Sequence, residues 1–138
     1  MSVTPEAALR EYVASLEAFD VEVAMTHYDL PCIFLTSQLP VLVAGADELR
    51  GALGAQLDQM RADHWQRSEA LNVRTIELAS TLAIVTSEIV RYDTAGDEIN
   101  RFRCAHTWRL RDRWLIAVVA VGDPAKGEWT ERSLGRDA

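Results

Sequence analysis

The run TLAIVTSEIVRY at residues 81–92 is rich in β-branched side chains, and two further runs of the same kind follow it. A polar break at residues 93–97 leads into residues 99–110, and a short turn at residues 111–113 leads into WLIAVVAV at residues 114–121. Strand-forming runs separated by such short polar breaks are typical of antiparallel hairpins. The segment therefore predicts three consecutive antiparallel strands.

The last of these runs does not alternate between apolar and polar residues. All eight residues from Trp114 to Val121 are apolar, which indicates that neither face of this strand meets water. Helices from the earlier part of the chain can cover one face of the sheet but are too few to cover both. We therefore expect a homodimer in which a partner subunit covers the convex sheet face.

The residues before this segment predict three helices, a strand pair and one more long strand. Thr4 and Pro5 are typical of a helix start, and Leu9, Tyr12 and Leu16 then recur at helical spacing. The expected elements are helices from Thr4 to Phe19, from Asp20 to Tyr28 and from Gly45 to Arg61, strands at 32–36 and 41–44, and a strand at 65–78 with a bulge near residues 69–70.

Composition limits the class of protein. A chain of 138 residues with 49% hydrophobic content is long enough for one domain with its own core, expected at residues 1–122 with a polar tail at 123–138. A net charge of -7 opposes a nucleic-acid partner, because binding phosphates requires a dense basic face. The start of the chain lacks a secretory signal pattern and no apolar run approaches the roughly 20 residues that span a bilayer, so we expect no membrane association and a cytoplasmic location.

Three stretches carry a resemblance to a known family. They are Phe19-Asp20 through Tyr28-Asp29, Gly45-Ala-Asp-Glu-Leu49, and Cys104-Ala-His-Thr-Trp-Arg-Leu-Arg-Asp-Arg-Trp114. In order and spacing they resemble the nuclear transport factor 2-like superfamily, and within it the SnoaL-like and ketosteroid-isomerase-like branches. The resemblance covers about residues 4 to 122. It implies an α+β, cystatin-like cone in which three N-terminal helices pack on a strongly curved, mostly antiparallel sheet.

The resemblance also implies a largely apolar pocket between the sheet and the helices, and a homodimer through the outer sheet face. Enzymes of this superfamily place a carboxylate or a His/Asp pair inside that pocket. Here the strand pair that carries the catalytic acid in the isomerase branch offers Thr36, Ser37 and Gln38, and no carboxylate falls between Pro31 and Ala46. Isomerase-type chemistry therefore lacks its obvious general base.

His106 is the leading candidate for chemistry. Alternation along residues 99–110 places it on one face with Phe102, Cys104, Trp108 and Leu110, and burial of these large groups favours that face for the cavity. A neutral imidazole is the usual proton shuttle at physiological pH. The other interpretation is a core histidine that bonds to a helix side chain such as Tyr12 or Tyr28. If instead the face with Arg103 and Thr107 lines the cavity, His106 belongs to the dimer surface.

Two further titratable residues are weaker candidates. Glu88 interrupts an apolar strand and is either a buried catalytic acid or one half of a charge pair with an arginine on a neighbouring strand. Cys104 shares a strand face with His106, but the strand rise separates them by roughly 7 Å, which is too far for a nucleophilic pair. His27, Asp29 and His64 show no metal-ligand spacing, so we expect no metal site.

The expected function is binding of a small apolar or aromatic molecule in the pocket. Its predicted lining is Tyr12, Tyr28, Trp65, Cys104, His106 and Trp108. The alternative is an isomerase, dehydratase or cyclase that works by general acid–base catalysis with His106 and Glu88 or a tyrosine. Neither function needs a cofactor.

Overall fold

A computed structural model describes residues 3–38 and 40–125 of the chain. Its elements are the helices α1 (Pro5–Ser15), the 3-10 turn η1 (Leu16–Ala18), α2 (Val21–Met25) and α3 (Ala46–Ala62), and the strands β1 (Tyr28–Leu35), β2 (Pro40–Val43), β3 (Trp65–Ala79), β4 (Leu82–Asp93), β5 (Glu98–Leu110) and β6 (Trp114–Val121).

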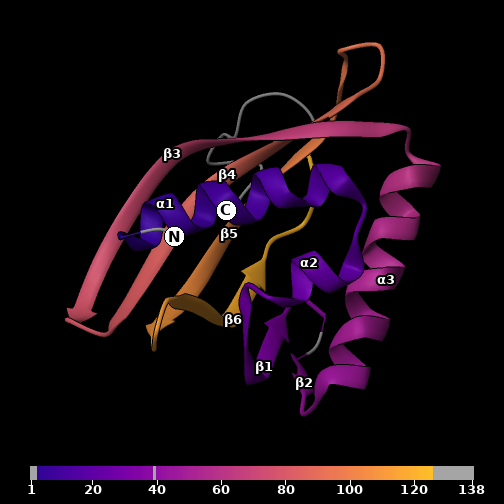
Figure 1. Cartoon of the computed structure of the whole chain (residues 1–138). Coiled ribbons are helices and arrows are strands. Elements are labelled where there is room, and N and C mark those ends of the chain that lie inside the picture. The colour runs from indigo at the N-terminus through magenta and orange to yellow at the C-terminus, as the bar shows by residue number, and fades with distance from the viewer. Residues whose placement is uncertain (1–2, 39, 126–138) are drawn as a thin grey trace.

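The strands form one six-stranded sheet in the order β2-β1-β6-β5-β4-β3 (Figure 1). The predicted meander is confirmed, because β3, β4, β5 and β6 are antiparallel neighbours in sequence order. The strand pair β1–β2 flanks it, and β1 runs parallel to β6. The α+β fold class and the mostly antiparallel sheet are therefore as the sequence predicts.

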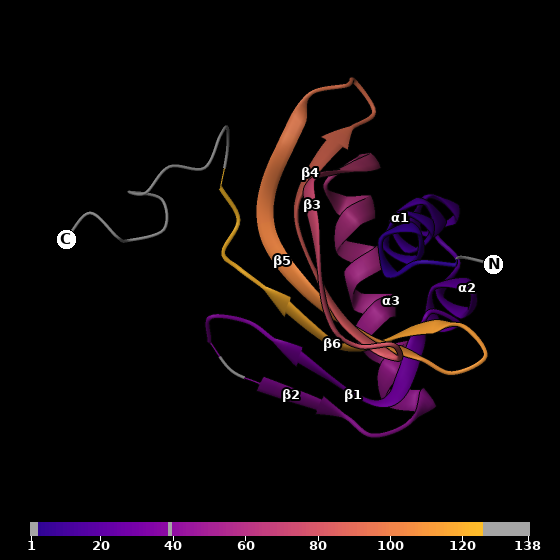
Figure 2. The same cartoon turned by 90° about the vertical axis from the view of Figure 1, so that its left-hand side faces the viewer.

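The helices lie on one face of the sheet, which curves around them (Figure 2). In α1 the Thr4 hydroxyl accepts a hydrogen bond from the backbone N–H of Ala7 at 3.1 Å, which satisfies a donor that the helix leaves open. Leu9 and Tyr12 then turn toward the sheet and are buried. Helix α3 buries the stripe Leu49, Leu53, Leu57 and Met60. The core thus lies between the helices and the inner sheet face.

The predicted end of the second helix is wrong. Helix α2 ends at Met25, and Tyr28 and Asp29 belong to β1. The reason is long-range pairing: the backbone N–H of Ile116 donates to the carbonyl oxygen of His27 at 2.8 Å, and Tyr28 pairs with Ile116 of β6. Pairing with a buried strand outweighs the local helical spacing that the sequence shows.

Asp29 forms ion pairs with two arginines of the β5–β6 hairpin. Its buried carboxylate accepts hydrogen bonds from Arg109 at 3.2 Å and from Arg111 at 3.0 Å. Both arginines are half-exposed, so they bring charge to Asp29 without being buried themselves. This ion pair fixes the start of β1 against the hairpin.

The long strand β3 carries its irregularity slightly later than predicted. Its register with β4 shifts between Leu71 and Arg74, where Asn72 has a φ of 52°, rather than at residues 69–70. It shifts again near each end of the strand. Such bulges increase strand twist and allow β3 to follow the curved sheet.

The described part of the C-terminal segment still follows the sheet. Arg101 and Ala125 exchange backbone hydrogen bonds of 2.7 and 2.8 Å. The remainder of the predicted polar tail lies outside the described residues. Among the helices that the structure describes, none combines the length and apolar character needed to cross a bilayer.

The outer sheet face, opposite the helices, carries a row of largely apolar side chains with one member per strand. The pairing register aligns these six positions directly across the sheet: Ile76, Ile84, Thr107, Val118, Ile33 and Leu42. Ile76 is 52% exposed at one end and Leu42 is 64% exposed at the other. We call these six residues the outer row.

Candidate functional site

A cavity of about 360 Å³ lies between the helices and the inner sheet face. Its lining comes from α1, η1, α3 and the strands β1, β3, β4, β5 and β6. Most of the surface is apolar, contributed by Val13, Leu16, Phe34, Met60, Ile89, Phe102 and Val119. A concave, mainly apolar site with a few polar groups is the usual form of a small-molecule pocket.

Two tyrosines form the first polar feature of this cavity. Helix α1 supplies Tyr12 and β1 supplies Tyr28, and their phenol oxygens lie 2.5 Å apart in a hydrogen bond. Burial raises the pKa of Tyr12 to about 12 and raises the pKa of Tyr28 well above its usual range. Both phenols therefore keep their protons at neutral pH.

His106 is the second polar feature, and it lines the cavity on the inner sheet face. Only 5% of the residue is exposed, and burial lowers the pKa of its imidazole to about 4. The ring is therefore neutral at pH 7. The thiol sulfur of Cys104 lies 3.8 Å from Nδ1, and the contact of the ring with Tyr12 is edge-on with ring centres 6.2 Å apart.

The predicted separation of Cys104 and His106 is therefore wrong. The strand rise gives the distance between their backbone positions, but both side chains stand on the concave face, where curvature draws them together. Burial raises the pKa of Cys104 to about 11. The thiol thus stays protonated beside a neutral imidazole, and it also lies 3.2 Å from the hydroxyl of Ser87 on β4.

Trp65 and Trp108 are not among the residues that line this cavity. Trp108 is fully buried in the core, where its ring centre lies 6.1 Å from that of His106. Trp65 packs edge-on against Phe19 and donates its indole N–H to Ser68 at 2.9 Å. Sharing a strand face with His106 was not enough to bring Trp108 to the cavity surface.

Glu88 lies on the outer sheet face, away from His106. It pairs with Arg101 of β5 at 2.8 Å and accepts a hydrogen bond from Asn72 of β3 at 3.2 Å. The charge-pair interpretation of Glu88 is therefore confirmed. Glu88 and His106 line different hollows, so the structure does not bring these two candidate residues together.

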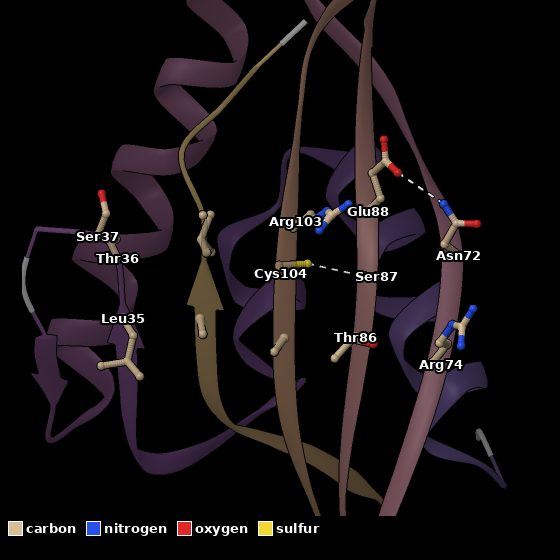
Figure 3. A pocket seen from close by; sticks show the side chains of 14 residues that line it. Leu35, Thr36, Ser37, Asn72, Arg74, Thr86, Ser87, Glu88, Arg103 and Cys104 are labelled. Carbon is tan, nitrogen blue, oxygen red and sulfur yellow. Dashed lines mark hydrogen bonds between the residues drawn. The ribbon is translucent and has the colours of Figure 1, made fainter. Parts of the chain in front are cut away.

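Glu88 belongs to a second, larger hollow on that outer face. This cleft of about 810 Å³ has residues 35–37 at one border and Asn72 and Arg74 of β3 at the other, with Arg103 of β5 and Glu88 of β4 between them (Figure 3). Its floor combines small apolar groups with the Glu88–Asn72 hydrogen bond. Cys104 lines both hollows, so it lies in the wall between them.

Sequence reasoning missed several polar residues at the inner cavity. Arg91 of β4 and Gln56 and Gln59 of α3 line it, and the Arg91 guanidinium donates to Asp63 at 3.2 Å. Alternation from Ile89 along β4 places Arg91 on the inner face, so that signal was present in the sequence. Among residues 3–38 and 40–125, no group of three His, Cys, Asp or Glu side chains is arranged to hold a metal ion.

Solved structures with the same architecture come from several bacteria. A protein of unknown function from Nostoc punctiforme with a cystatin-like fold aligns with a TM-score of 0.71 and 16% identity, over 91% of this chain and 98% of that one. A putative scytalone dehydratase from Novosphingobium aromaticivorans gives 0.64 and 13%, over 91% and 86%. A ketosteroid isomerase-like protein from Erwinia carotovora gives 0.60 and 15%, over 85% and 91%.

At these identities the structural likeness shows the fold alone. No curated protein matches the chain in sequence. A family model described as NTF2-like protein (DUF6841) matches residues 5–124, which include every described helix and strand and both hollows. The chain therefore belongs to this NTF2-like family.

Proposed function

We propose that the protein binds a small apolar or aromatic molecule in the cavity between helices and sheet. The observation that carries this proposal is the cavity itself: about 360 Å³, apolar along most of its wall, with Tyr12, Tyr28 and His106 gathered on its polar part. Pockets for small ligands commonly have volumes of about 300–1,000 Å³ and this division of polar and apolar surface.

The electrostatics of the cavity favour an uncharged ligand. The two phenols, the Cys104 thiol and the His106 imidazole are all neutral at pH 7. Arg91 is the one charged side chain among the described lining residues, and Asp63 pairs with it. A charged ligand would lose its hydration in this cavity and would find no side chain of opposite charge that is not already paired.

General acid–base catalysis is the second candidate function. The convergence of His106, Cys104, Tyr12 and Tyr28 in one cavity supports it, because such catalysis needs at least two titratable groups within reach of one ligand. Their pKa values oppose it, since efficient acids and bases titrate near the working pH. Binding is therefore the better-supported function.

Naphthalene is a suitable first probe because it is flat, apolar and uncharged. We expect saturable one-to-one binding by isothermal titration calorimetry. Replacing Val119 with phenylalanine should fill part of the cavity and weaken binding at least about tenfold. The control Val23→Phe changes an exposed residue of α2 that does not line the cavity, and it should bind as the unmodified protein does. Equal affinity for all three proteins would contradict the proposed site.

We further propose that a second copy of the chain covers the outer face. The outer row supports this, because a line of largely apolar side chains across all six strands is costly to leave in water. Its midpoint falls between Thr107 and Val118, and both of its ends are apolar and exposed. A two-fold axis through that midpoint would therefore pair the row with itself.

Thr107→Glu tests this arrangement, because the axis would bring two like charges together. Light scattering should give twice the chain mass of 15.4 kDa for the unmodified protein and a lower mass for the variant. Thr94→Glu, in the exposed turn between β4 and β5, adds the same charge elsewhere and should stay dimeric. A mass of 15.4 kDa for the unmodified protein would rule out the dimer.

A further inference from the structure

The inner cavity and the outer cleft share part of their lining. Four residues line both hollows: Leu35 and Thr36 at the end of β1, Cys104 of β5, and Val121 at the end of β6. The two hollows therefore adjoin each other where β1 and β6 end.

The sheet is incomplete at this place. The last pair between β1 and β6 joins Leu35 to Ala120, so in the described sheet residues 121–122 have a neighbouring strand on one side only. On that side the backbone N–H of Gly122 donates to the carbonyl oxygen of Arg103 at 2.8 Å. Because β1 stops here, the sheet has a notch beside residues 121–122, between its inner and outer faces.

A single hydrogen bond spans this notch. The hydroxyl of Ser37, just after β1, donates to the carboxylate of Asp123, just after β6, at 2.6 Å. Both residues are exposed, and a hydrogen bond of this kind contributes only about 1 kcal/mol to stability. Breaking it to admit a ligand chain would therefore cost little.

The outer cleft differs from the inner cavity in charge. Two exposed arginines line it, Arg103 of β5 and Arg74 of β3. Among its described lining residues the carboxylate is Glu88, which Arg101 already engages at 2.8 Å and Asn72 at 3.2 Å. The lining of the cleft therefore favours an anion, although the whole chain carries a net charge of -7.

We propose that the two hollows together bind one amphipathic anion, with its apolar part in the inner cavity and its carboxylate beyond the notch at Arg103. This inference rests on the proposed binding function and names its ligand class. The backbone of Arg103 lies one strand spacing, about 5 Å, from Gly122. Its guanidinium has five N–H donors, so it can hold a carboxylate beside its other contacts. The neutral cavity then receives only the uncharged part of the ligand.

The proposed dimer does not block this path. Along β6 the order is Val118 of the outer row, Ala120 in the lining of the cleft, and then the notch at residues 121–122. The path from the cavity through the notch to Arg103 therefore does not cross the outer row.

Three probes of equal length test the ligand class by isothermal titration calorimetry at pH 7. They are 5-(2-naphthyl)pentanoic acid, its primary amide, and 5-(2-naphthyl)pentan-1-amine. We expect the anionic acid to bind about tenfold more tightly than the neutral amide, and the cationic amine to bind most weakly. Added salt should reduce the advantage of the acid and leave the affinity of the amide unchanged. Equal affinities for acid and amide would overturn the proposal.

A short acid tests whether the carboxylate must cross the notch. 2-Naphthoic acid has the same ring system but no chain that can pass between the two hollows. It should therefore bind no more tightly than 2-naphthamide. An advantage as large as that of the long acid would place the carboxylate inside the cavity and contradict the proposed path.

Variants assign the preference to residues. Arg103→Gln should reduce the acid-to-amide affinity ratio at least about fivefold, and the more distant Arg74→Gln should reduce it less, while the amide binds as before. The control Arg67→Gln removes the same charge from a part of β3 that lines neither hollow, and it should keep the full ratio. A ratio lost in Arg91→Gln but kept in Arg103→Gln would put the carboxylate in the cavity and overturn the proposal.

Asp123 provides a test in the opposite direction, because its carboxylate lies beside the notch and repels an anion. Asp123→Asn keeps an acceptor for Ser37 and removes this charge, so the acid should bind several-fold more tightly and the amide equally well. Weaker binding of the acid would contradict the path through the notch. If naphthalene itself does not bind, the proposed binding function fails; if it binds but acid and amide do not differ, only this inference fails.

Discussion

Replacing Trp108 by alanine is expected to lower the free energy of unfolding by about 3–5 kcal/mol, more than the truncation of any smaller core side chain should. Trp108 is the largest of the side chains that are fully buried. On the sheet it pairs with Ala83 and Ile116, which are themselves completely enclosed. Its removal would leave a cavity that the surrounding strands cannot close.

The control for this prediction is Trp108→Phe. The indole N–H of Trp108 is a buried donor for which the described residues offer no acceptor. Phenylalanine keeps an aromatic ring and removes this unsatisfied donor, so it should cost less than half as much as alanine. Urea unfolding at matched protein concentration measures both. A loss below about 1 kcal/mol for alanine would show that the ring is not in the core.

Acidification is expected to destabilise the protein through His106 by roughly 3 kcal/mol between pH 7 and pH 4. Burial lowers the pKa of His106 to about 4, whereas an unfolded chain has a histidine pKa of about 6.5. Between these values the unfolded state binds a proton that the native state does not. Stability is therefore constant above about pH 7, falls as the pH drops toward 4, and the loss is complete below that value.

The neighbours of His106 do not offset this effect. Tyr12 of α1, Tyr28 of β1 and Cys104 of β5 keep their protons throughout this pH range. His106→Gln keeps a polar side chain that does not titrate in this pH range. The difference in unfolding free energy between the two proteins therefore isolates the contribution of His106 from that of the carboxylates. Denaturant unfolding from pH 7 to pH 4 gives that difference. Parallel curves for both proteins would contradict the neutral, buried ring.

Much of the fold follows from local pattern. The β-branched runs from residue 81 onward specify the meander, because strand period and turn chemistry agree there. The Thr4 cap and the α3 stripe specify two helices for similar reasons. The place where α2 gives way to β1 could not be predicted this way, since the pairing of Tyr28 with Ile116 joins residues far apart in the chain.

The site was less predictable than the fold. Alternation correctly placed His106, Cys104 and Phe102 on the inner face, but it does not say which side chains of that face reach the cavity and which are buried in the core. Trp108 shares that face and lies in the core beyond the cavity. The contact between Cys104 and His106 depends on sheet curvature, and the tyrosine pair depends on how α1 packs on the sheet. Both are properties of the assembled fold rather than of any one segment.

The ¹⁵N titration of the His106 ring, with and without naphthalene, tests most directly whether this residue is a neutral group in a ligand-binding cavity. We expect a ring that stays neutral down to about pH 4 and whose resonances shift when naphthalene is added. A ring that titrates near its ordinary pKa of about 6.5 and does not respond to naphthalene would contradict both the burial of His106 and its place in a binding site.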